Sequence, residues 1–109
     1  MLADRKSEES EYSQEKIKEF QRNLGFGDSG PDVQNLQKFL NQQGFAVAEE
    51  GPGASGQETK LFGQRTESAL RRFQEFIAEQ NPAVVGQVVS SGFLDFLTRA
   101  YINRLLGEF

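Results

Sequence analysis

The sequence predicts a mainly α fold, a compact bundle of three helices around one shared core. Segments at about 31–43, 64–81 and 95–106 carry apolar residues at the spacing of amphipathic helices. Because each segment has a single apolar stripe, the three helices can bury these stripes only by packing together. The chain has 109 residues, of which 37% are hydrophobic, and this is enough for one such core.

The first helix is predicted to begin at Pro31 and to end near residue 43. Proline suits the first helical position because its fixed φ matches the helix and a backbone N–H is not needed there. Gly44 follows as a left-handed cap. The polar face is predicted to hold Gln34, Asn35, Gln37 and Lys38, and the apolar stripe consists of Val33, Leu36, Phe39 and Leu40.

The segment between the first two helices is predicted to be mostly irregular. Residues 45–47 and 60–62 are short apolar runs that either pair as a minimal two-stranded hairpin or stay irregular. Residues 49–58, which lie between them, are acidic and rich in glycine. We therefore expect a long loop at this point.

The second helix is predicted to follow Gly63 and to end near Asn81, because Pro82 disfavours a helical residue before it. Its apolar stripe consists of Ala69, Leu70, Phe73, Phe76 and Ile77. Residues 83–91 are then predicted to form a linker, with Val88 and Val89 against the core.

The third helix is predicted to be capped by Asp95 and stopped by Gly107. Its inward-facing residues are predicted to be Leu97, Ala100, Tyr101 and Leu105.

Residues 1–23 are predicted to be an arm that precedes the main domain, residues 24–107. The first dozen residues are polar and lack periodicity, so we expect them to be mobile. Ile17, Phe20 and Leu24 lie at helical spacing behind a candidate cap at Ser13. An extended segment over 20–24 is the alternative, because three residues form only a short stripe.

The composition argues against several classes of function. The chain contains no Cys and no His, which removes disulfides, the usual zinc ligands and imidazole bases. We therefore expect no catalytic residue, no metal site and no cofactor. A net charge of −4 argues against nucleic acid as a partner, and the short apolar runs argue against a membrane span. The first residues lack the pattern of a secretory signal, so if the protein is exported, we expect this sequence to be its mature form or a shortened form of it.

Two familiar motifs are interpreted as parts of loops. Residues 25–30 spell G-x-G-x-x-G, but the polar segment before them is no buried strand and no βαβ unit follows, so these glycines are interpreted as turn and cap residues. Glu49, Glu50 and Glu58 lack the alternating pattern of a calcium loop and are interpreted as solvated carboxylates.

The starts of the second and third helices share a weak internal repeat. When Thr66 is aligned with Thr98, Phe62 falls on Leu94 and Gly63 on Asp95. Each helix therefore begins with an apolar residue, a turn or cap residue and a threonine. The pattern is compatible with two similar helix starts and with a duplicated turn–helix unit.

Short motifs at the starts of the three predicted helices follow one another in a characteristic order. They are LGFGDSGPDV, LQKFL and QGF between residues 24 and 45, FGQRT, AL and FQ between 62 and 74, and GF and TRA between 92 and 100. In this order and at these spacings, the motifs resemble the peptidoglycan-binding-like domain family. The resemblance covers residues 24 to about 106, and it favours a duplicated turn–helix unit over two similar helix starts.

This resemblance implies a small three-helix module that holds a cell-wall hydrolase or another exported protein on peptidoglycan without cutting it. It also implies a location at the cell wall, outside the cytoplasm. Relatives in which the same domain docks a protein make a protein–protein interaction module the alternative.

The predicted ligand groove is shallow and lies between the end of the first helix, the segments around Phe45 and 60–66, and the start of the third helix. Arg65 and Arg99 stand at helix N-termini, where anions are favoured, so their guanidinium groups are candidates for a carboxylate of the peptidoglycan stem. Phe45 and Tyr101 are candidates for contact with sugar rings. The predicted ligand-binding residues are Gln43, Phe45, Lys60, Arg65, Thr66, Arg99 and Tyr101.

Overall fold

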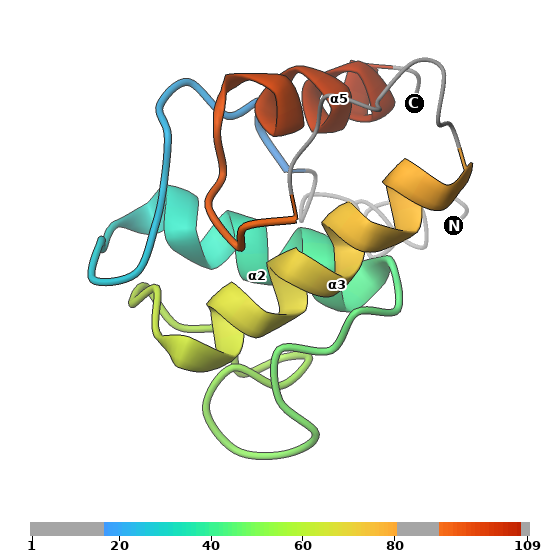
Figure 1. The fold of residues 1–109 in the computed structure, drawn as a ribbon. Coiled ribbons are helices and arrows are strands. Elements are labelled where there is room, and N and C mark those ends of the chain that lie inside the picture. The colour runs from blue at the N-terminus through green and yellow to red at the C-terminus, as the bar shows by residue number, and fades with distance from the viewer. Residues whose placement is uncertain (1–16, 81–89, 108–109) are drawn as a thin grey trace, which may run out of the picture.

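The computed structural model describes residues 17–80 and 90–107, and within these ranges the chain forms helices and no strand. The helices are α2 (Pro31–Gln42), α3 (Gln64–Gln80) and α5 (Phe96–Gly107). In Figure 1, α3 runs diagonally across α2, and α5 lies above both. The predicted mainly α class is confirmed, and the observed helix bounds lie close to the predicted ones. None of these helices is both long and apolar enough to cross a membrane.

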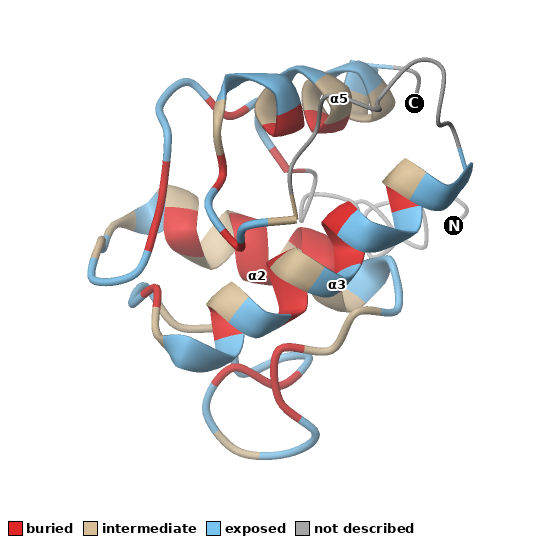
Figure 2. Cartoon of the chain, in the orientation of Figure 1, coloured by how far each residue is buried: buried red, intermediate tan, exposed pale blue. Residues whose placement is uncertain are grey.

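The core forms where the apolar stripes of α2 and α3 meet. All four stripe residues of α2 are buried, and the ring of Phe39 meets that of Phe73 edge to face, with 5.3 Å between the centroids. Figure 2 shows the buried residues on the facing sides of the helices. The predicted stripe of α3 is confirmed except at Phe76, which is 46% exposed at the outer edge of the stripe and packs against Phe45.

The inward face of α5 differs from the prediction. Leu97 is 39% exposed and Ala100 is also exposed, whereas Thr98 and Ile102 are fully buried. Tyr101 and Leu105 are partly buried against the core, as predicted. The face with Thr98 turns towards the core because two hydrogen bonds hold this residue. Its backbone N–H donates to Asp95 Oδ1 at 2.9 Å, and its hydroxyl accepts a hydrogen bond from the side chain of Gln74 in the core. The predicted cap at Asp95 is therefore confirmed.

The segment before α2 is extended, which confirms the alternative to a helix. Ile17, Phe20 and Leu24 are buried in the core. Leu24 pairs with Leu94 through two backbone hydrogen bonds of 3.2 and 2.8 Å, and the side-chain amide of Asn103 bonds both the N–H and the carbonyl of Phe20. Our predictions for Ser13, for residues 1–12 and for residues 83–89 lie outside the described residues.

The segment before α3 pairs with the segment before α2. Gly27 N–H donates to the carbonyl of Phe62 at 2.8 Å, and Phe62 N–H donates to the carbonyl of Asp28 at 2.9 Å. The hairpin between 45–47 and 60–62 does not form in the part of the chain that the structure describes. Residues 60–62 instead pair with the loop before α2, and they thereby connect the loop that leads into α3 to the loop that leads into α2.

A buried glutamine on each of α2 and α3 holds the loop that leads into the next helix. Gln37 accepts a hydrogen bond from Thr59 N–H at 2.6 Å and donates to the carbonyl of Leu61 and to the hydroxyl of Thr66, both at 3.0 Å. The prediction that Gln37 lies on the polar face is wrong, because its amide satisfies backbone groups that would otherwise be buried without partners. We call this arrangement an amide clamp.

Gln74 forms the second amide clamp. It accepts from Gly92 N–H at 2.8 Å and donates to the carbonyl of Phe93 at 2.9 Å and to the hydroxyl of Thr98 at 3.1 Å. In both clamps the carbonyl belongs to the residue five positions before the threonine, and the threonine is the third residue of its helix. The internal repeat seen in the sequence is therefore repeated in the hydrogen bonding.

We expect Gln74→Met to lower the free energy of unfolding by at least about 2 kcal/mol. Methionine nearly matches glutamine in size, but it leaves the bonded groups of Gly92, Phe93 and Thr98 without a partner. Urea denaturation of the variant and of the control Gln80→Met, at an exposed position of α3, measures the difference. Equal stability of the two variants would show that the clamp is not needed.

Candidate ligand-binding site

A polar hollow of about 470 Å³ opens between α3 and the loop that follows α2. Residues 46–50 form one wall, and Arg65, Ser68 and Arg72 form the other. The second wall is a single helix face, because residues at positions i, i+3 and i+7 lie above one another. This size is within the range of small-ligand sites.

Both walls of the hollow are anchored to the rest of the fold. The side chain of Asn41 on α2 accepts from Val47 N–H at 2.9 Å and donates to Gly53 and Glu58 farther along the loop. The guanidinium of Arg72 donates to the carbonyl of Ala46 at 2.9 Å and so ties the loop to α3. The loop from 46 to 58 has no regular structure, but its path is fixed by these bonds.

The hollow carries opposite charges that do not neutralise each other. Arg65 is an exposed residue in the first turn of α3, and Glu49 and Glu50 are exposed on the facing loop. Within residues 17–80 and 90–107, none of these three side chains forms an ion pair or a hydrogen bond. The positive end of α3 adds to the attraction of Arg65 for an anion.

The seven predicted binding residues are not gathered in one place. Arg65 lines the hollow, and Phe45 immediately precedes its loop wall. Thr66 is buried in the clamp of Gln37. Gln43 and Lys60 are exposed, on the turn after α2 and on the loop before α3 respectively.

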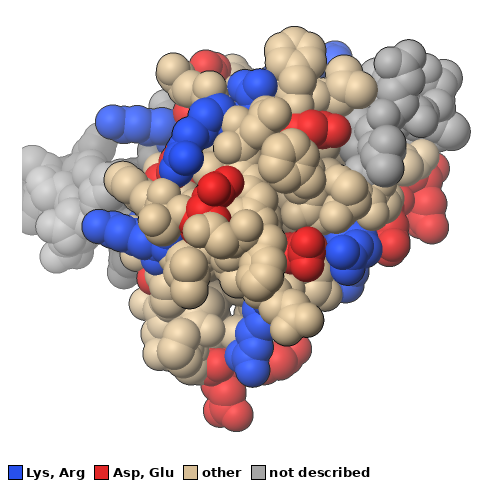
Figure 3. Space-filling model, turned by 60° about the vertical axis from the view of Figure 1, so that its left-hand side comes forward, with Lys and Arg blue, Asp and Glu red and all other residues tan. Residues whose placement is uncertain are grey.

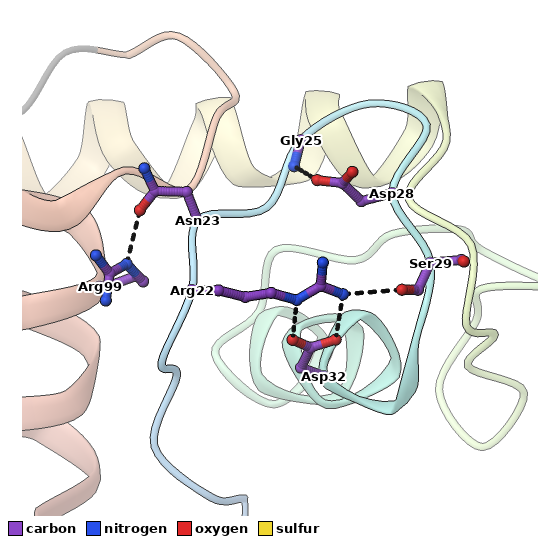
Figure 4. Close-up of polar contacts among 7 residues, drawn as sticks. All are labelled: Arg22, Asn23, Gly25, Asp28, Ser29, Asp32 and Arg99. Atoms are coloured by element: carbon purple, nitrogen blue, oxygen red, sulfur yellow. Dashed lines mark hydrogen bonds and ion pairs between the residues drawn. The ribbon is translucent and has the colours of Figure 1, made fainter.

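The aromatic candidates Phe45 and Tyr101 pack against the core. Their ring centroids lie 5.6 and 6.4 Å from that of Phe73, and both residues are partly buried. Arg99 lies on α5, where its Nε donates to Asn23 Oδ1 at 2.8 Å and its guanidinium carbon lies 5.5 Å from the ring centre of Phe96. Figure 4 shows that the bond to Asn23 joins α5 to the extended N-terminal segment.

Three exposed phenylalanines in the loops or first turns that lead into helices were missed by the sequence analysis. Phe26 and Phe96 are each 65% exposed, and Phe93 is 41% exposed. The ring of Phe93 lies directly over Gly25, where a Cβ would be only 2.7 Å from Cδ1 of that ring. Figure 3 looks onto the side with these loops, and uncharged residues cover much of it between scattered side chains of both charges. No spacing rule identifies such residues, because they precede the periodic segments or begin them.

A second hollow, of about 1170 Å³, lies between the extended segment 17–22, the start of α2 and the end of α5. Two of its charged residues, Arg22 and Asp32, already form an ion pair with each other. Figure 4 shows Arg22 donating from Nε and Nη2 to both carboxylate oxygens of Asp32, at 2.7 and 3.0 Å, and to the carbonyl of Ser29 at 2.8 Å. This pair ties the N-terminal segment to α2, so we assign it a structural role.

The comparison with known families agrees with the resemblance seen in the motifs. A family model for the peptidoglycan binding domain matches residues 29–77. The resemblance to this family is confirmed over these residues. The match includes α2, the loop wall of the hollow and most of α3, so Arg65, Ser68 and Arg72 all lie within the matched segment. Neither the curated proteins nor the solved structures include a significant match to the chain.

The ion pair between Arg22 and Asp32 predicts part of the acid sensitivity of the fold. The hydrogen bonds from Arg22 are the main cause that lowers the pKa of Asp32 below its ordinary value. A lowered pKa in the folded state stabilises the protein above about pH 4, and this contribution is lost as the pH falls through the lowered pKa. We expect Asp32→Asn to lose stability at pH 7 but to show a smaller further loss between pH 5 and pH 3 than the unchanged protein.

Urea unfolding at a series of pH values measures this difference, with Glu79→Gln at an exposed position of α3 as the matched control. If Asp32→Asn and the unchanged protein lose stability in parallel as the pH falls, the assignment of the ion pair is wrong.

Proposed function

We propose that this chain is a non-catalytic binding module that attaches a parent protein to the peptidoglycan of the bacterial cell wall, outside the cytoplasm. The family match over residues 29–77 is the observation that carries this proposal. The position of the hollow supports it, since both of its walls come from the matched segment.

The chemistry of the hollow supports binding without cleavage. Glu49 and Glu50 are neighbours on one exposed loop, whereas hydrolysis of a glycosidic bond needs two carboxylates that face each other across the substrate. Among the described residues, the Ser68 hydroxyl forms no hydrogen bond with Glu49, Glu50 or any other group that could act as its base, whereas a nucleophilic serine is activated by a base within hydrogen-bond reach. These groups suit the holding of a charged ligand.

Arg65 is the proposed anchor of the ligand, and Phe45 adjoins the same site. A guanidinium group binds a carboxylate through two parallel hydrogen bonds, and peptidoglycan stems carry carboxylates. The site is open and desolvates few groups, so we expect the affinity of one module to be modest. Gln43, Lys60, Thr66, Arg99 and Tyr101 stay predictions as binding residues.

Docking of a partner protein is the second candidate function, and the exposed phenylalanines favour it. Phe26, Phe93 and Phe96 are apolar side chains on the surface of a small domain, and such side chains are typical of interaction surfaces when they lie together. This function would use residues other than those around Arg65, so the two candidates predict different sensitive positions.

We expect the protein to be depleted from solution by sedimentation with purified peptidoglycan sacculi. Arg65→Ala should weaken this binding about tenfold, because a charge-assisted hydrogen bond is lost. Arg104→Ala, at an exposed position of α5, is the matched control and should bind like the unchanged protein.

Phe96→Ser separates the two candidate functions in the same assay. It should leave the binding to sacculi intact if Arg65 is the anchor. If the unchanged protein fails to sediment at every salt concentration tested, peptidoglycan attachment is excluded and docking of a protein is favoured.

A further inference from the structure

We propose that the hollow beside α3 binds the free end of an uncross-linked stem peptide, with Arg65 on its carboxylate and Glu49 and Glu50 on its ammonium group. This inference rests on the proposed function and adds to it that the module recognises the peptide part of peptidoglycan. The ligand class is therefore a peptide end that carries both charges within a few ångströms.

The charges of the hollow carry this inference. Two cations, Arg65 and Arg72, face two anions, Glu49 and Glu50, across one hollow, and none of them forms an ion pair with another described residue. Arg72 is hydrogen-bonded to the carbonyl of Ala46, so Arg65 is the cation whose donors are left for a ligand. Opposite charges that share a site without pairing are available to a ligand with the complementary arrangement. A ligand with only a carboxylate would meet the repulsion of Glu49 and Glu50, and a purely cationic ligand would meet that of Arg65.

Hydrogen bonds fix the backbone of both walls, which carries these charges, before a ligand arrives. Asn41 bonds Val47 N–H two residues before Glu49, and Arg72 bonds the carbonyl of Ala46. On the other wall, the clamp of Gln37 holds Thr66, the neighbour of Arg65. A site that is ordered in advance loses less entropy on binding.

The lining favours the peptide over the glycan. Sugars are bound mainly by hydrogen bonds and by aromatic rings against the sugar face, but residues 46–50, Arg65, Ser68 and Arg72 include no aromatic side chain. The hydroxyl of Ser68 and the backbone of the loop are suitable partners for the amide groups of a peptide. The volume of about 470 Å³ accommodates the end of a peptide and not a long glycan strand.

Competition against sedimentation with sacculi tests this assignment. The competitors are a soluble muramyl tripeptide that ends in diaminopimelate, the same tripeptide with its free amine acetylated, and an N-acetylglucosamine tetrasaccharide. For the unchanged protein, we expect the tripeptide to compete, the acetylated form to compete about fivefold less well, and the tetrasaccharide to have no effect.

The variant Glu49→Gln/Glu50→Gln should no longer distinguish the free from the acetylated tripeptide, while the control Glu79→Gln should distinguish them as the unchanged protein does. Equal competition by both tripeptides with the unchanged protein would overturn the assignment of the two glutamates.

Sacculi from which an amidase has removed the stem peptides separate this inference from the proposed function. Loss of binding to the stripped sacculi supports recognition of the peptide. Equal binding to stripped and intact sacculi overturns the inference and leaves attachment to peptidoglycan standing, whereas failure to bind either material overturns both.

Discussion

The amide clamps of Gln37 and Gln74 are the interaction on which the rest of the structure depends. The loops that lead into α3 and α5 have no regular structure, so their buried backbone groups need partners from side chains. One glutamine supplies a donor and an acceptor to each loop and also bonds the threonine in the first turn of the next helix. Each clamp therefore fixes both the path of a loop and the rotation of the helix that follows.

Side chains of helix α2 also position both walls of the candidate site. Through Gln37 it fixes the first turn of α3, where Arg65 lies, and through Asn41, one turn farther along, it fixes the loop that carries Glu49 and Glu50. The two walls of the hollow are thus set by amide side chains of a single helix. The ligand therefore binds to a surface that is already ordered in the folded protein. The hollow is shallow, and its selectivity comes from the positions of its charged side chains.

The sequence predicted the helices well because their ends carry strong local signals, such as Pro31, Gly44 and Asp95. It predicted the extended segment at 20–24 only as an alternative, because the pairing of Leu24 with Leu94 is a contact between distant parts of the chain. The burial of Gln37 and the rotation of α5 could not be predicted from hydrophobic spacing, which assigns polar residues to the surface. One wall of the candidate site could be predicted from the sequence, because Arg65, Ser68 and Arg72 share a helical spacing. The position of the facing glutamates could not be predicted, because it depends on the path of the loop that carries them.

Mapping of backbone amide chemical shifts during titration with a soluble peptidoglycan fragment tests the central claim most directly. If the clamps hold a preformed hollow that receives the ligand, the shifts will concentrate on residues 46–50 and 65–72, and the clamped amides of Thr59 and Gly92 will stay unchanged. Shifts centred on Phe26, Phe93 and Phe96, or a general change that includes both clamped amides, would contradict the account.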